Sequence, residues 1–467
     1  MQKTFLLEYK FLIIGFIIGC LFIFVVPPFQ SPDEDSHFKK AYVISNGDFF
    51  PTTDNSISGF YLPIAMQDYI SDKTSRMGDL DWKYNYSDLY YDQLLSSDFS
   101  SQQLYNFSTV SITPIAHLIP AFGILLAKIF SPVFISGSGS IPVADMLYFA
   151  RFTSLISYLL LGFFSIKIAP IFKKSICAIL LLPMSMFLGS MVSYDGLLIS
   201  IVALAFALIM NLIYNKKCLF SMKYFGIFVL IGYILLNIKI VYFPLLLLLI
   251  FVPKEKFSKN NKIKYLTLLL VSILCLTFLF KIPYLLLPSN SVSLASQQIH
   301  FVLSHPFYFL YVLLSNIYHQ FWTQLYWMIG TFGLLDTYLP PLAIVLCLIN
   351  LLFIFILDAS CGKKKISIKI KVISLLSLSF SIFAIFSAMY IDWTPKVLNV
   401  IGGNIITGVQ GRYFLPLLVF IPILLSNTFL SKKINFTKEN VFFDLSLLVI
   451  IIVLCLSILM CIIRFWI

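Results

Sequence analysis

Residues 196–214 read GLLISIVALAFALIMNLIY, a run that contains no charged side chain. Its length is close to the ~20 apolar residues that an α-helix needs to cross a lipid bilayer. Asp195 precedes the run, and Lys216 and Lys217 follow it closely. The stretch therefore predicts a transmembrane helix, and apolar runs of the same kind recur along the whole chain.

The composition of the chain agrees with this interpretation. Of the 467 residues, 59% are hydrophobic and only 12% are charged, and the mean hydropathy is +0.93. A soluble domain typically carries about 25% charged residues. We therefore expect an all-α integral membrane protein in which residues 1–467 form a single body of helices packed side by side.

The net charge of +12 does not indicate a nucleic-acid partner. Such a partner requires a basic surface interleaved with polar residues. Here the basic residues form short clusters between apolar runs, as in the cytoplasmic loops of membrane proteins. The clusters are Lys173-Lys174, Lys216-Lys217, Lys254 to Lys264, Lys363 to Lys371 and Lys432-Lys433.

A topology follows when these clusters are placed on the cytoplasmic side. The first helix is then an uncleaved span with its N-terminus inside. Eleven spans are predicted in total, at residues 11–27, 144–166, 175–193, 196–214, 221–237, 240–252, 265–287, 340–357, 372–390, 411–430 and 441–463.

Two further apolar stretches, 110–131 and 306–330, do not fit this alternation. If either crossed the membrane once, a lysine cluster would move to the outside. Both stretches also carry polar side chains, among them His117 in the first and Gln324 in the second. We interpret them as re-entrant or interfacial helices on the outer face. The alternative is about thirteen true crossings.

The predicted outer face carries most of the material that lies between the spans. Its segments are 28–143, 288–339 and 391–410, whereas the inner face has only short basic loops. Twelve of the chain's 21 acidic residues lie in 28–109. We therefore expect a large, structured extracytoplasmic loop with juxtamembrane helices, and any chemistry on that side.

The first strong local signal is the stretch PFQSPDEDSHF at residues 28–38. Asp33, Glu34, Asp35 and His37 follow directly after the first span, and Pro27-Pro28 ends that helix. Carboxylates near a low-dielectric boundary can serve as general bases or can hold a cation. A solvated acidic loop would give the same pattern.

Four more charged residues lie at the predicted ends of apolar spans: Arg151, Asp195, Lys239 and Arg412. An ionisable group beside the membrane is costly and is a functional candidate. Asp195 also fits a helix N-terminus, and the cations also fit interfacial anchors. The predicted topology places all four on the outer face with Asp33.

Carboxylates and cations on one face suit the transfer of a group from a lipid-phosphate donor to a hydroxyl. Arginine in particular presents a rigid fork to phosphate oxygens. A transporter would place its ionisable residues within the spans, near mid-membrane. Neither a phosphate-binding glycine loop nor an HExxH or GxSxG motif occurs in the sequence.

At these residues the chain resembles DUF2142, a bacterial family of polytopic membrane proteins that is itself similar to the GT-C fold glycosyltransferases. The match runs in order over nearly the whole chain. Its pieces are Pro32-Asp33-Glu34 with His37-Phe38, Gly47, Arg151, Pro183, Ser193-Tyr194-Asp195, Lys239, Gly333-Leu334-Leu335-Asp336-Thr337 with Leu339-Pro340, and Gln410-Gly411-Arg412-Tyr413-Phe414 with Pro416. Leu334-Leu335 departs from the aromatic residue that is more usual after the glycine.

The resemblance implies an inverting glycosyltransferase with a polyprenyl-phosphate monosaccharide donor. The acceptor would be a cell-envelope polysaccharide or glycolipid at the outer face of the bacterial plasma membrane. Asp33 and Glu34 occupy the catalytic position, with Asp33 as the base or the residue that orients the acceptor. The expected substrate-binding residues are His37, Arg151, Asp195, Lys239, Asp336, Arg412 and Tyr413.

No cofactor is required by this scheme, because two cations would neutralise the phosphate leaving group. A divalent metal at Asp33 and Glu34 is the less favoured alternative. Two other functions stay open from the residues: a flippase or transporter of lipid-linked sugars, and a non-catalytic scaffold of an envelope-synthesis complex.

Overall fold

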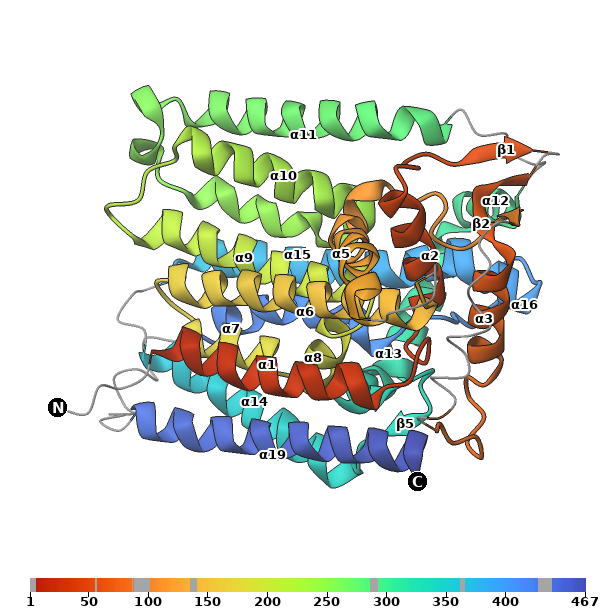
Figure 1. Ribbon diagram of the computed structural model, residues 1–467. Helices are drawn as coiled ribbons and strands as arrows, with labels where there is room; N and C mark the ends of the chain where they lie inside the picture. Colours follow the sequence, from red (N-terminus) through yellow and green to blue (C-terminus); the bar gives the residue numbers. More distant parts are fainter. Residues whose placement is uncertain are drawn as a thin grey trace.

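A computed structural model describes residues 6–54, 57–85, 87, 101–134, 141–285, 293–361, 366–426 and 439–467. Helices dominate it, and most of them lie side by side and run in the same direction across the view (Figure 1). The predicted all-α integral membrane fold is therefore confirmed. Lys363 to Lys365 and Lys432-Lys433, from two of the basic clusters, lie outside the described residues.

Seven of the described helices are long and apolar enough to cross a membrane. Each of them coincides with a predicted span. They are α1 (Leu7–Val25), α6 (Val143–Ile168), α9 (Tyr194–Tyr214), α11 (Lys262–Leu285), α14 (Pro341–Cys361), α15 (Ile368–Ala388) and α19 (Glu439–Trp466). A π-turn, η5 (Met389–Trp393), and α16 (Thr394–Leu398) continue α15.

The other four predicted spans are also helical, but each is short, broken or tightly wound. The segments are α7 (Lys173–Leu180) with α8 (Pro183–Gly189), α10 (Met222–Ile238), the 3₁₀ helix η2 (Ile240–Phe251), and the 3₁₀ helix η6 (Gly411–Phe420) with α17 (Ile421–Leu425). A 3₁₀ helix rises ~2.0 Å per residue, against ~1.5 Å for an α-helix. The 12 residues of η2 therefore span about 24 Å, which explains how so short a segment can run most of the way across a bilayer.

Polar contacts join the helices at one end of the bundle, which we call the basic end. Lys10 donates to Asp444 at 2.7 Å, and Lys174 pairs with Glu439. Lys256 donates to backbone carbonyls of the 215–218 turn. Two short 3₁₀ turns, η3 (Lys254–Lys256) and η4 (Ser258–Asn260), lie in the same loop. The described basic clusters thus gather at one end of the bundle.

The opposite end, which we call the loop end, carries the segment between α1 and α6. Its elements are α2 (Glu34–Ser45), β1 (Thr52–Asp54), β2 (Ile57–Pro63), α3 (Ile64–Ser75), β3 (Gln102–Tyr105), η1 (Pro114–Ala116) and α5 (Leu118–Phe134). The three strands form a small antiparallel sheet in the order β1-β2-β3, with Thr52 opposite Gly59 and Phe60 opposite Tyr105. The sequence interpretation had not predicted this sheet.

Residues 110–131 and 306–330, the two apolar stretches that did not fit the predicted inside–outside alternation, differ in orientation or shape from the spanning helices. In Figure 1, α5 is seen nearly end-on, whereas the spanning helices run across the view. Helices α12 (Leu294–Ser304) and α13 (Pro306–Gly330) meet at a bend of 107°. The ribbon of β4 (Thr331–Phe332) and β5 (Thr337–Tyr338) follows α13.

The polar side chains of α13 hold the segment that leads into η6. Asn316, Gln320 and Gln324 donate hydrogen bonds to the carbonyls of residues 404, 406 and 409. These three side chains are four residues apart, so they share one face of the helix. The polar residues in 306–330 therefore position the start of η6 at the loop end.

A buried ion pair fixes the exit of the chain from α1. Arg151, in α6, donates to both carboxylate oxygens of Glu34 at 2.8 and 2.6 Å. It also donates to three carbonyls at the end of α1, those of Ile23, Val26 and Pro27. These carbonyls have no partner within the helix. The pair therefore ties α1, α2 and α6 together.

We predict that Glu34→Gln destabilises the fold strongly. The change leaves the Arg151 guanidinium charged, fully buried and without its counter-ion, which typically costs about 3–5 kcal/mol. The free energy of unfolding in detergent, measured by denaturant titration, tests this. The matched control is Asp35→Asn, because Asp35 is 31% exposed and pairs with Lys39, so its loss should cost less than about 1 kcal/mol. Equal stabilities for the two variants would contradict the assignment.

Candidate functional site

Asp33 lies at the turn into α2 and turns its carboxylate away from the helix. Its φ of +61° places it in the left-handed region, which Asp tolerates better than most residues. Its side chain does not cap α2. Instead, the carboxylate accepts a hydrogen bond of 2.7 Å from Arg412, and the Asp33 side chain is still 55% exposed. It is therefore accessible to a ligand.

Arg412 lies in the first turn of η6, where the backbone packs closely against α13. A Cβ atom on the preceding Gly411 would lie 2.2 Å from the backbone nitrogen of Met328, so only glycine fits there. The guanidinium is 5% exposed. Its Nη2 contacts Asp33, and its Nε lies 3.4 Å from a carboxylate oxygen of Asp195. Arg412 thus bridges two carboxylates.

Asp195 and Lys239 extend this contact across two more segments. Asp195 lies in the first turn of α9, whose N-cap is Ser193. Lys239 separates α10 from η2 and donates to Asp195 at 2.7 Å. The ammonium of Lys239 also lies 3.9 Å from the centroid of the Tyr413 ring, a favourable cation–π distance. The start of α9 and the starts of both 3₁₀ segments therefore meet at one point.

The four charged groups form the chain Asp33–Arg412–Asp195–Lys239, which has no net charge. Asp195 and Arg412 are nearly buried, and Lys239 is 18% exposed. The structure thus brings together four residues that the sequence placed on one face, although they are up to 379 positions apart in the chain. Asp33 is the accessible end of this network.

The electrostatics of Asp33 reflect its partner. Partial burial favours the neutral acid, but the charges of Arg412 and of His37 outweigh burial and hold the pKa of Asp33 below its ordinary value. At neutral pH the group is a carboxylate. While it is paired with Arg412, it is a weak base.

Two histidines lie together beside this network. Nδ1 of His37, in α2, is 2.8 Å from Nε2 of His117, at the end of η1. The His37 ring also packs edge-on against Tyr194, with centroids 4.5 Å apart. Burial lowers the pKa of His37 to about 4, despite the opposing charges of Asp33 and Asp195. Both rings are therefore neutral near pH 7, because burial also lowers the pKa of His117.

His117 was not among the site residues predicted from the sequence. The sequence shows it as a polar residue in an apolar stretch, but nothing in the sequence indicates its partner. The contact depends on how α2 packs against α5, which follows directly after His117. Only the tertiary fold could reveal this pair.

Several predicted site residues lie elsewhere or have another role. Glu34 and Arg151 are 0% exposed, so they cannot contact a substrate as predicted, and they hold the fold instead. Asp336 pairs with Arg464 of α19 at 2.8 Å, apart from the four-charge chain. Tyr413 does belong to the site, through its ring contact with Lys239.

No group of three or more metal-ligating side chains occurs among the described residues.

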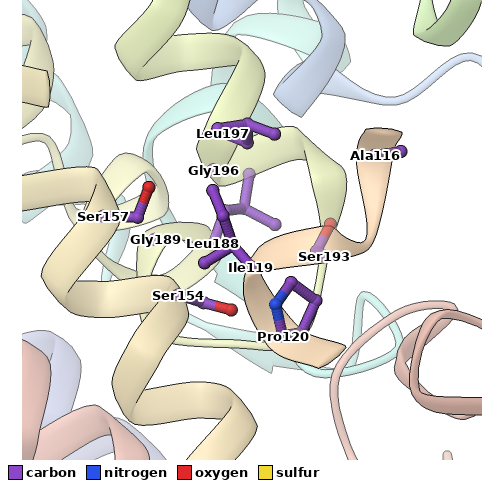
Figure 2. A pocket seen from close by; sticks show the side chains of 10 residues that line it. All are labelled: Ala116, Ile119, Pro120, Ser154, Ser157, Leu188, Gly189, Ser193, Gly196 and Leu197. Atoms are coloured by element: carbon purple, nitrogen blue, oxygen red, sulfur yellow. The ribbon is translucent and has the colours of Figure 1, made fainter. Parts of the chain in front are cut away.

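Two hollows lie close to the network, and Leu188 of α8 lines both. The first encloses ≈ 280 Å³ of empty space, its mouth included, among α5, α6, α8 and α9. Figure 2 shows its lining residues: Ala116, Ile119, Pro120, Ser154, Ser157, Leu188, Gly189, Ser193, Gly196 and Leu197. The second has room for about one water-sized group and is lined by Pro32, Met184, Phe187, Leu188, Trp327, Thr331, Leu335, Gln410, Gly411 and Arg412.

We predict that His37 makes the fold less stable in mild acid. Its pKa is about 4 in the folded state and about 6.5 when unfolded, so the unfolded chain binds the proton more readily. Stability therefore falls as the pH drops from about 6.5 to 4, by on the order of 3 kcal/mol over the full titration. His37→Gln should lose less thermal stability between about pH 7 and pH 4.5 than the parent protein.

Thermal unfolding in detergent at several pH values measures this effect. His300→Gln, on the exposed surface of α12, is the control and should keep the parent pH dependence. If His37→Gln and the parent protein lose stability in parallel as the pH falls, the predicted role of His37 is wrong.

Comparison with known proteins adds one finding. The sequence pattern of the family described as "Predicted membrane protein (DUF2142)" matches residues 16–421. No curated protein and no solved structure matches the chain. Since the matched region covers well over half of the chain and includes the entire four-charge network, the chain belongs to the DUF2142 family of predicted membrane proteins.

Proposed function

We propose that the protein is an inverting glycosyltransferase of the GT-C type. It would transfer one sugar from a polyprenyl phosphate to a polysaccharide or glycolipid of a bacterial cell envelope. The observation that carries the proposal is the exposed Asp33 carboxylate held by the buried Arg412, with Asp195 and Lys239 directly behind it. A hydroxyl acceptor needs a carboxylate that can take its proton, and an anionic leaving group needs cations that neutralise it.

The orientation of the site supports an extracytoplasmic reaction. Lysine clusters favour the cytoplasmic side of a membrane. The described clusters lie at the basic end, and Asp33 lies at the loop end, next to the exit of α1. The acceptor and the sugar-phosphate would therefore meet on the outer face.

The charges of the network suggest how the donor binds. The resting site is neutral, so a phosphate must take the place of one carboxylate. Asp33 is the exchangeable partner, because it is exposed, whereas Asp195 is enclosed between Arg412 and Lys239. The Arg412 fork suits two phosphate oxygens, and Lys239 supplies a second positive charge close by.

This exchange would also prepare Asp33 for the reaction. Once the phosphate occupies Arg412, the cation that holds the pKa of Asp33 down is neutralised, and the carboxylate becomes more basic. The acceptor oxygen then attacks the anomeric carbon on the face opposite the phosphate. The bond from that carbon to the phosphate oxygen breaks, its electron pair leaves with polyprenyl phosphate, and Asp33 accepts the hydroxyl proton. No step in this scheme requires a metal.

The placement of the charges argues against the two rival functions. A transporter of lipid-linked sugars would place its ionisable groups at mid-membrane, inside helices. Here the network lies at the loop end of the bundle, beside the exit of α1. A scaffold would have no need of an exposed carboxylate in a left-handed backbone conformation beside a buried guanidinium.

We predict that Asp33→Asn lowers the rate of sugar transfer by about 10²–10⁴-fold, since loss of a general base has this effect. The measurement is transfer from a polyprenyl-phosphate sugar by purified protein in detergent. Asp35→Asn, two residues along the same turn, is the control and should keep the parent rate. Full transfer by Asp33→Asn would exclude Asp33 as the base.

We also predict that Arg412→Lys weakens donor binding and slows transfer, although the charge is kept. Lysine cannot present two parallel N–H donors to a phosphate. Arg76→Lys, at an exposed position in the loop, should leave both quantities unchanged. If both Asp33→Asn and Arg412→Lys leave envelope composition unchanged in cells, as mass spectrometry would show, the scaffold function is favoured instead.

A further inference from the structure

A narrow pocket lies directly beside the Asp33–Arg412 pair. Pro32, which precedes Asp33, forms one part of its wall, and Arg412 forms another. Side chains of α8 supply an apolar surface, and Trp327 of α13 adds an aromatic one. The pocket has room for about one water-sized group, so a single hydroxyl can enter it, whereas a whole ring cannot.

Two polar side chains that line this pocket lack a hydrogen-bond partner. Thr331 is 1% exposed, and its Oγ1 is unpaired. Oε1 of Gln410 is also buried and unpaired. Buried polar atoms nearly always have partners, so two unsatisfied atoms in one pocket call for an explanation. One hydroxyl group can serve both, because it can donate to Oε1 of Gln410 and accept from the Thr331 hydroxyl.

We propose that this pocket receives one hydroxyl group of the donor's sugar ring, with Thr331 and Gln410 selecting among sugars. The inference rests on the proposed function and adds the location of the sugar. If the phosphate binds Arg412, the attached ring lies within one bond of it, and Arg412 also forms part of the wall of this pocket.

The chemistry of the lining favours a sugar over the other parts of the substrates. A polyprenyl chain has no polar group to satisfy Thr331 or Gln410. A phosphate needs positive charge, and of the ten lining residues only Arg412 carries any. A sugar ring offers apolar C–H groups for Trp327 and Phe187, and a hydroxyl for the two unpaired oxygens. The pocket has room for one hydroxyl group, so the rest of the ring would lie at its mouth.

The test compares binding of two probes to the full-length protein in detergent by titration calorimetry. One probe is undecaprenyl phosphate, and the other is a set of undecaprenyl-phosphate monosaccharides that differ in single hydroxyl positions. Thr331→Val removes the hydroxyl and keeps the shape. The matched control is Thr337→Val, because Thr337 is a buried threonine of the same two-stranded ribbon that does not line the pocket.

The expected result is that Thr331→Val weakens binding of the preferred sugar-bearing lipid by about 2- to 10-fold, the effect of one lost hydrogen bond. Binding of undecaprenyl phosphate should be unchanged, and Thr337→Val should affect neither probe. Gln410→Met should reorder the preference among the sugars. This second variant keeps the test valid if Thr331→Val folds poorly.

Three results overturn the inference. Equal affinity of the parent protein for lipids with and without the sugar excludes a sugar site, as does an equal loss for both probes in Thr331→Val. A change only in the KM for the acceptor assigns the pocket to the acceptor instead. The proposed function fails separately: tight, Thr331-dependent sugar-lipid binding without any transfer would leave the pocket standing and remove the glycosyltransferase.

Discussion

The guanidinium of Arg151 and the carboxylate of Glu34 meet where α1, α2 and α6 come together, and neither side chain is exposed. Arg151 also donates hydrogen bonds to backbone carbonyls at the end of α1. Glu34 accepts a hydrogen bond from the backbone N–H of Val192, just before α9. One ion pair therefore sets the position of the chain on both sides of the site. Asp33 is next to Glu34 in sequence, so its reach toward Arg412 depends on this pair.

Much of the architecture was predictable because lipid imposes simple rules. A long apolar run such as 196–214 has few structures open to it other than a helix. Lysine clusters then fix the direction of each run, and the described clusters do lie at one end. The same rules placed Asp33, Asp195, Lys239 and Arg412 at one end of the bundle, where the structure joins them in one network.

The site residues that the sequence analysis assigned wrongly or missed also have a physical explanation. Glu34 and Asp33 are neighbours of the same chemical kind, and sequence alone could not show that one faces a buried guanidinium and the other faces solvent. The left-handed backbone conformation of Asp33 at this point is also not visible in the sequence. Asp336 was assigned to the site by its motif, but it serves α19 through Arg464. The His37–His117 contact required the packing of α2 on α5.

The 3₁₀ segments η2 and η6 also determine how far Lys239 and Arg412 lie from the basic end of the bundle. Lys239 and Arg412 each stand at the start of such a segment, and the far end of η2 is held by Lys262, which donates to the carbonyl of Ile250. With the rise per residue of an α-helix, the same 12 residues would be about 6 Å shorter, and Lys239 would be drawn that far toward the basic end of the bundle. The winding of the backbone, rather than the number of residues, thus keeps the positive charge at the loop end of the bundle.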